Sequence, residues 1–286
     1  MKKDENEGLA KKLLNIDQKI IFIILFLAFA LPLLYPIVLP MKVDKLSQQA
    51  YDFVEALPEG SIILMENGNG ASTYPQCGSG MVVQMVQLLS KDMKIVMFTC
   101  GPQTAFWADK AIQGALSKLP SDVPAENGVN WVHLGFVTGG ETGVAALASD
   151  IRSVIKKDYY GTPIEEIPLL KDINHANDFD AVVWHGAAET SIPWGIRQVV
   201  VPFGLPMTGS VTLVDISSVY PYIDAGLLNG VVGGLKGSAD YEYLMRMTGP
   251  ALAQIMTVNI AGIFWIVLII MGNILHFVVR KEEVGN

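Results

Sequence analysis

Four apolar runs of strand length are each followed by residues that could contact a ligand. Each of these strand ends carries small or polar residues, with amide, hydroxyl, imidazole or carboxylate side chains close to glycines. Glycine lets a backbone approach a ligand closely, and the free N–H groups of a following helix attract an anion. The sequence therefore predicts a crevice for a small polar ligand, with these candidate contacts: Asn67, Gly68, Thr99, Gly139, Glu141, Thr142, His185, Glu189 and Thr190.

Two of these candidates are carboxylates at predicted helix starts. Glu141 and Glu189 each precede a threonine and follow a glycine by one to three residues. A carboxylate there already complements the helix dipole, so these two residues favour a ligand that also carries a cationic group. The alternative is that the strand ends are tight turns and helix caps with no ligand at all.

A nucleophilic active site would need a serine or cysteine close to a histidine and an acid. Ser79 lies in Cys77-Gly78-Ser79-Gly80, which is not the nucleophile-elbow pattern. His185, Glu189 and Asp215 could converge at the crevice, but the sequence singles out no nucleophile. We therefore assign no catalytic residue.

Cofactor and metal motifs are also missing from the sequence. Gly68-x-Gly70 lacks the third glycine of the dinucleotide fingerprint, and the Walker lysine motif is absent. The histidines and acids show no metal-ligand spacing. His133 alternates with Trp131 and Gly135, which indicates a core histidine. We expect no cofactor and no metal.

The two cysteines allow two interpretations. Cys77 follows the first predicted strand and Cys100 ends the second, so both could lie at one edge of the sheet. A disulfide between Cys77 and Cys100 is compatible with a domain outside the cytoplasm. The alternative is two buried free thiols that pack as small apolar groups.

Apolar runs of strand length alternate with stretches of helical period, and these elements must position the candidate residues. Such alternation predicts right-handed βαβ units and an open, mostly parallel, Rossmann-like α/β sheet of about five strands. The segment 156–178 interrupts this rhythm, and we interpret it as an ordered surface excursion. The predicted strands are 61–65, 94–99, 130–137, 180–184 and 210–215, and the predicted helices include 48–57, 81–89, 106–119, 143–155 and 194–201.

Three motifs carry a resemblance to a known group of proteins. They are Gly139-Gly140-Glu141, Asp158-Tyr159-Tyr160-Gly161-Thr162-Pro163, and the glycine-rich stretch from Gly233 to Glu242. With these motifs, residues 58–244 resemble a group of uncharacterised prokaryotic membrane-anchored proteins with a Rossmann-like extracytoplasmic domain. The resemblance implies this architecture, and it implies no activity and no catalytic residue.

Two charge-free apolar stretches predict one N-terminal and one C-terminal transmembrane helix, at 20–40 and 251–279. A cleaved signal peptide is the alternative for the first stretch. Seven basic residues flank the spans on the side of the termini and four on the other side. This bias predicts cytoplasmic tails at 1–19 and 280–286, and an extracytoplasmic domain at 41–250, in the cell membrane.

The composition restricts the function of that domain. Hydrophobic residues make up 51% of the chain and charged residues 17%, and the net charge of −8 argues against nucleic acid as a partner. The partners we expect are the lipid bilayer, other copies of the chain or other membrane proteins, and a small polar ligand. The leading hypothesis is a non-enzymatic assembly or ligand-binding module of a larger membrane complex. The alternative is a hydrolase-like extracytoplasmic enzyme or a solute-binding protein that uses the strand-end crevice.

Overall fold

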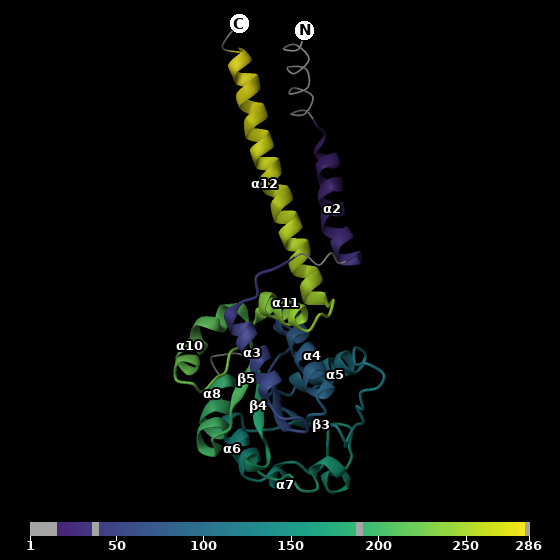
Figure 1. Ribbon diagram of the computed structural model, residues 1–286, viewed down its shortest axis with the longest axis vertical. Helices are drawn as coiled ribbons and strands as arrows, with labels where there is room; N and C mark the ends of the chain where they lie inside the picture. Colours follow the sequence, from purple (N-terminus) through teal and green to yellow (C-terminus); the bar gives the residue numbers. More distant parts are fainter. Residues whose placement is uncertain (1–15, 36–39, 187–190, 284–286) are drawn as a thin grey trace. The chain divides into compact units, whose positions relative to one another are not determined.

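The computed structural model describes residues 16–35, 40–186 and 191–283 (Figure 1). The chain divides into two units. One is globular and comprises residues 41–252, and the other consists of the two terminal segments, which join the globular unit at residues 40 and 253. We describe each unit by itself.

Within the described residues, the globular unit contains a parallel sheet of six strands in the order β3-β2-β1-β4-β5-β6. The prediction of an α/β, Rossmann-like parallel sheet is therefore confirmed, although the sheet has one strand more than expected. The fifth strand also begins and ends earlier than predicted. The strands are β1 (Ile62–Asn67), β2 (Lys94–Thr99), β3 (Trp131–Phe136), β4 (Ala181–His185), β5 (Met207–Val211) and β6 (Val232–Gly233).

Helices cover both faces of the sheet, which explains why the strands are apolar along their whole length. Residues alternate between the faces, so that Ile63 and Met65 of β1 pack on one layer and Leu64 packs on the other. The first layer contains α3 (Lys45–Ala56), α4 (Tyr74–Ser90) and α5 (Thr104–Leu116). The second contains α6 (Glu141–Ser149), α7 (Ile151–Val154), α8 (Ser191–Gly195), the π-helical turn η4 (Ile196–Val200), α9 (Val201–Phe203) and α10 (Ile216–Asp224).

The segment 156–178 is an ordered excursion, as its sequence indicates. It forms three short 3₁₀ turns that bury Ile164, Ile167 and Leu170 in the core of the second layer. Arg152 fixes the segment to α7, because its Nη1 donates a hydrogen bond to the carbonyl oxygen of Ile173 at 2.8 Å. The turns are η1 (Ile164–Glu166), η2 (Pro168–Leu170) and η3 (Ala176–Asp178).

The glycine-rich segment after α10 forms β6 and the start of α11 (Gly234–Leu244). Glycine is required here because the backbones approach closely. A Cβ on Gly230 would lie 2.5 Å from the backbone nitrogen of Ala50 in α3, and Gly230 has a φ of +71°. These glycines therefore let β6 and α11 pack against α3.

The terminal segments contain α2 (Gln18–Leu34) and α12 (Pro250–Glu283). Among the described residues, one helix is long and apolar enough to cross a membrane, at Pro250–Phe277. Helix α2 is apolar but has 17 residues, about 25 Å at 1.5 Å per residue, which is less than the ~30 Å of a hydrocarbon core. The predicted span at 20–40 is thus helical over 20–34, and residues 36–39 lie outside the described part.

Candidate functional site

The order of the sheet reverses between β1 and β4, which is the place where open α/β sheets bind ligands. Here the two strand-end loops touch each other. The backbone nitrogen of Gly68 donates a hydrogen bond to the carbonyl oxygen of His185 at 2.5 Å. A Cβ on Gly68 would lie 3.3 Å from the Cα of Gly186. Gly68 and His185 do meet as predicted, but their backbones close the crevice in this part of the described chain.

A buried glutamate lies beneath this closed crevice. Glu66 is fully buried at the end of β1, and its Oε2 accepts a hydrogen bond from the Ser191 hydroxyl at 3.0 Å. The indole nitrogen of Trp184 donates to the same Ser191 oxygen at 2.6 Å. Burial raises the pKa of Glu66 to about 8, so this carboxyl group holds its proton at neutral pH. Sequence analysis did not select Glu66 or Ser191, although a charged residue inside an apolar run is a visible signal.

Two predicted ligand contacts instead stabilise the loops. The Asn67 side chain donates to the carbonyl oxygens of Asn69 at 3.3 Å and Thr104 at 3.1 Å, and its Oδ1 accepts from the Asn69 amide. The Thr99 hydroxyl donates to the carbonyl oxygens of Gly101 and Gly135 at 3.4 and 3.5 Å. Both side chains are buried, and their hydrogen bonds join the ends of β1, β2 and β3.

His185 lies on the opposite face of the sheet from Glu66. Because strand residues alternate, His185 shares its face with Val183, whereas Glu66 and Ser191 belong to the other layer. Its Nδ1 is 2.8 Å from the Ser210 hydroxyl, and its buried Nε2 has no hydrogen-bond partner among the described residues. Burial lowers the pKa of His185 to about 3, so the ring is neutral. Ser191, Glu66 and His185 therefore do not form a catalytic triad.

The residues after β3 meet the second helical layer rather than the β1–β4 crevice. Glu141 accepts hydrogen bonds from Nε and Nη2 of Arg197, each at 2.8 Å, and another from Gln198. The bonds from Arg197 and Gln198 hold the pKa of Glu141 at about 2. Gly139 has a φ of +95°, and its carbonyl oxygen accepts the Thr142 hydroxyl at 2.8 Å. Gly139, Glu141 and Thr142, which were predicted to contact a ligand, therefore form a turn and join α6 to the π-helical turn η4.

The remaining predicted residues have different positions. Glu189 and Thr190 lie outside the described residues, so the ligand contacts predicted for them stay predictions. Cys77 and Cys100 are not joined in the structure, where Cys77 is buried and Cys100 is partly exposed, and the disulfide between them stays a prediction. Cys77 is in the first turn of α4 rather than at a strand end, and burial raises its pKa to about 12. In the described chain, no group of three or more His, Cys, Asp or Glu residues could hold a metal ion.

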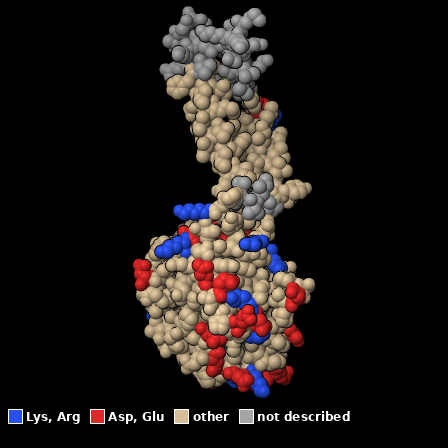
Figure 2. All heavy atoms as spheres, in the orientation of Figure 1, with Lys and Arg blue, Asp and Glu red and all other residues tan. Residues whose placement is uncertain are grey.

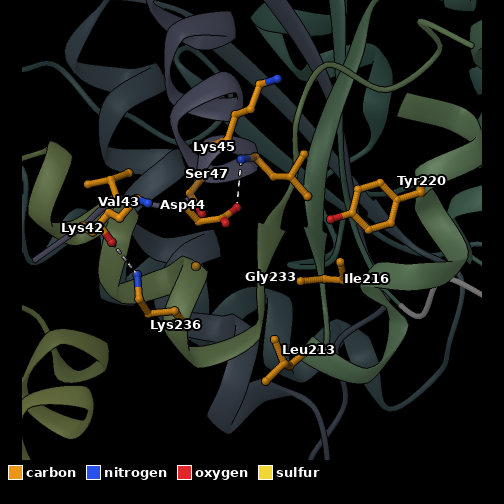
Figure 3. Close-up of a pocket in the computed structure, with 12 residues that line it drawn as sticks. Lys42, Val43, Asp44, Lys45, Ser47, Leu213, Ile216, Tyr220, Gly233 and Lys236 are labelled. Carbon is orange, nitrogen blue, oxygen red and sulfur yellow. Dashed lines mark hydrogen bonds between the residues drawn. The ribbon is translucent and has the colours of Figure 1, made fainter. Parts of the chain in front are cut away.

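An open cavity lies farther along the same edge of the sheet, beyond the carboxyl ends of β5 and β6 (Figure 3). Its volume is about 460 Å³. Its walls come from the residues before and in the first turn of α3, from the 3₁₀ turn η5 (Leu213–Asp215) with α10, and from the start of α11. Sequence analysis missed this cavity because its lining residues are far apart in the chain. The lining includes Lys42, Asp44, Lys45, Ser47, Leu213, Ile216, Tyr220, Gly233, Lys236 and Gly237.

Comparison with known proteins gives no relative for this chain: no protein-family model, no curated protein and no solved structure matches it.

Proposed function

We propose that the chain is a two-span protein of the cell membrane with cytoplasmic termini. Its Rossmann-like domain is extracytoplasmic and acts as an assembly or ligand-binding module of a larger membrane complex. The apolar segments at 20–40 and 251–279 and the distribution of basic residues support this topology. The expected associates are lipid, further copies of the chain or other membrane proteins.

The observation that carries the proposal is that α11 holds both connections of the domain to the terminal segments. On the entry side, Asp240 accepts the Asp44 backbone amide at 3.1 Å, and Lys236 donates to the Lys42 carbonyl oxygen at 3.1 Å. On the exit side, Glu242 accepts the backbone amide of Leu252 at 2.6 Å. A domain whose two tethers are fixed to one helix is well suited to making defined lateral contacts.

Anchoring in the membrane also favours association between copies of the chain, because it raises their local concentration. Two spans confine neighbouring copies to the plane of the membrane, which raises their effective concentration, so that weak lateral contacts are enough to close a ring. Two spans also form no transport path by themselves, so a transport role would need self-association or partners. Confinement to the membrane plane therefore favours an assembly role over an isolated enzyme.

A second candidate function is a solute-binding protein or a hydrolase-like enzyme at the strand-end crevice. The supporting observation is that two buried side-chain nitrogens beside the crevice, Asn69 Nδ2 and His185 Nε2, have no hydrogen-bond partner among the described residues. Leaving such groups unpaired costs free energy, so a ligand or a water that accepted from them would be stabilised. The catalytic form of this candidate is disfavoured, because His185 and Ser191 lie on opposite faces.

The mass of the native particle tests the proposal. The full-length protein is crosslinked with an amine-reactive reagent at native expression level, and the detergent-solubilised protein is then sized by light scattering. We expect a uniform particle that is several times heavier than the 31.1 kDa chain. If both measurements give only monomer, the assembly role is wrong. A monomer that retains a small molecule in mass spectrometry would support the second candidate.

A further inference from the structure

The cavity beyond β5 and β6 has a cationic lining. Lys42, Lys45 and Lys236 are among the residues that line it. Lys236 forms an ion pair with the buried Asp240, whereas Lys42 and Lys45 have no ion-pair partner among the described residues. Asp44 is the carboxylate among the lining residues, and its Oδ1 caps α3 through the Leu46 amide. The lining therefore contains three lysines and one aspartate, and the Asp44 carboxylate already accepts a hydrogen bond.

The same cavity offers hydrogen-bond donors that the described protein does not use. Ser47 is only 1% exposed and lines the cavity, yet its hydroxyl makes no hydrogen bond with another described residue. The start of α11 also faces the cavity through Gly233, Lys236 and Gly237, and no side chain caps this helix. Uncapped amides at a helix start, a free hydroxyl and ammonium groups together are the donors that bind a phosphate group.

Apolar side chains continue this site to the surface of the domain. Leu213, Ile216 and Tyr220 line the cavity, and Figure 3 shows the Tyr220 hydroxyl directed toward its interior. Leu213 is 59% exposed and its neighbour Val214 is 85% exposed. A free anion gains nothing from such exposed apolar side chains, whereas the glycerol and acyl carbons next to a lipid phosphate do.

The position of the site in the chain agrees with a lipid ligand. Lys42 is two residues after Pro40, the last residue of the charge-free stretch, and two extended residues span at most about 7 Å. We propose that this cavity binds the phosphate-bearing headgroup of an anionic membrane lipid. The phosphate chemistry follows from the lining alone, while lipid as its source rests on the membrane anchoring proposed above.

The charge of the whole domain makes this a local site rather than a general attraction to membranes. Residues 41–250 contain 13 basic and 22 acidic residues, so the domain as a whole is repelled by anionic lipid. On the face of the globular unit shown in Figure 2, acidic side chains are widely spread and several basic ones lie along its upper end. Binding should therefore depend on particular lysines and not on net charge.

Native mass spectrometry of the full-length protein in detergent tests the proposal, with dioleoylphosphatidylglycerol and dioleoylphosphatidylcholine as probes. We expect one phosphatidylglycerol per chain to bind at least tenfold more tightly than phosphatidylcholine. The double variant Lys42→Gln, Lys45→Gln should weaken phosphatidylglycerol binding about tenfold, since it removes two charge-assisted contacts. Both lysines are exposed, so the variant should fold as the parent does, which circular dichroism checks.

A matched control separates the site from net charge. The variant Lys157→Gln, Lys171→Gln changes the charge by the same amount at exposed positions outside the cavity, and it should bind phosphatidylglycerol as the parent does. Tyr220→Ala should weaken phosphatidylglycerol binding by a larger factor than glycerol 1-phosphate binding, because only the lipid has acyl carbons to contact the apolar side chains. Equal binding of the two lipids, or an equal loss in the control variant, would overturn the proposal.

A soluble probe distinguishes lipid from a free phosphate compound. If glycerol 1-phosphate binds the parent as tightly as phosphatidylglycerol does, lipid as the source is wrong. The stoichiometry is measured per chain, so it does not depend on assembly. A chain that stays monomeric and still binds phosphatidylglycerol would contradict only the assembly role, and an assembled particle that binds no lipid would contradict only the lipid site.

Discussion

Glu66 is a carboxyl group that the fold keeps inside the hydrophobic core, between β1 and α8. Its hydrogen bonds come from the Ser191 hydroxyl and, at 3.4 Å, from the Cys100 amide. These donors stabilise the charged form, but the loss of hydration is larger, and the pKa of Glu66 rises to about 8. Such a buried carboxyl group affects the stability of the folded protein in a way that depends on pH.

We therefore predict that Glu66 makes the protein less stable as the pH rises. The pKa in the folded protein exceeds the ordinary value of 4.5, so this contribution is complete below pH 4.5 and is lost as the pH approaches 8. The loss is about 1.4 kcal/mol per pH unit inside this window. His185 and His133 have lowered pKa values and act in the opposite direction below pH 6.5. Thermal melts between pH 6.5 and 8 avoid the histidines, and a comparison with a Glu66 variant separates Glu66 from Glu242, whose pKa burial also raises.

The variant Glu66→Gln is the direct comparison, because it is neutral and nearly isosteric, and the Ser191 hydroxyl can rotate to pair with the new amide. Its melting temperature should fall less than that of the parent between pH 6.5 and 8. Glu59→Gln, at an exposed position, should behave like the parent. Parallel pH profiles for the parent and Glu66→Gln would mean that Glu66 is ionised in the folded protein.

The candidate residues show what a single sequence can and cannot predict at this scale. Residue type and strand-end position correctly brought Gly68 and His185 together. The face of each side chain depends on strand register, which pairs Asn67 with His185 and Glu66 with Trp184. Register is a property of two distant segments, so the sequence did not reveal that Glu66 and His185 face opposite layers. It also did not reveal that Arg197 already pairs with Glu141.

At the scale of elements, most strands and helices were predicted because they are long apolar or periodic runs. Strand β6 was missed because it has two residues, Val232 and Gly233, and no apolar run of its own. It exists because β5 offers an unpaired edge and α3 supplies the Leu46 carbonyl oxygen, which accepts the Val231 amide. Packing against the same distant elements, β5 and α3, also allows the glycine-rich segment to form the start of α11.

We predict that α11 fixes the two connections of the domain to the terminal segments independently of each other. Asp240→Ala removes the acceptor of the Asp44 amide, and Glu242→Ala removes the acceptor of the Ala251 and Leu252 amides at the start of α12. The loss of one such hydrogen bond costs about 1 kcal/mol. Hydrogen exchange should accelerate about fivefold at the affected amides, which is that cost expressed as an opening equilibrium.

The two variants control for each other. In Asp240→Ala the faster exchange should be confined to the Asp44 region, and in Glu242→Ala it should be confined to residues 250–252. Both side chains are fully buried, so a general loss of stability would affect the two variants alike. If either substitution accelerates exchange equally at both tethers, α11 does not hold them separately.

For the whole molecule, composition and alternation were sufficient for the α/β class, because covering both faces of a parallel sheet demands apolar strands. The number of membrane spans is harder to derive. The stretch 20–40 has the length of a span only if its residues are all helical, and Pro32 and Pro36 oppose this. Among the described residues, α2 ends at Leu34, soon after Pro32. Whether α2 crosses the bilayer is therefore the main question for the topology.

A protease-accessibility experiment answers this question with the full-length chain. A site for a specific protease is inserted between Ser121 and Asp122, which are both exposed, and epitope tags are placed at Met1 and Asn286. In intact spheroplasts we predict cleavage at the inserted site and full protection of both tags from a general protease. The control carries the cleavage site after Asn286, where it should be cut only after the membrane is permeabilised.

If the tag at Met1 is digested together with the domain while the tag at Asn286 is protected, α2 does not span and the protein has a single C-terminal anchor. If the inserted site is protected in intact cells, the domain is cytoplasmic. The long domain between the spans would then have decided the orientation in place of the basic residues that flank them, because long segments translocate largely regardless of charge.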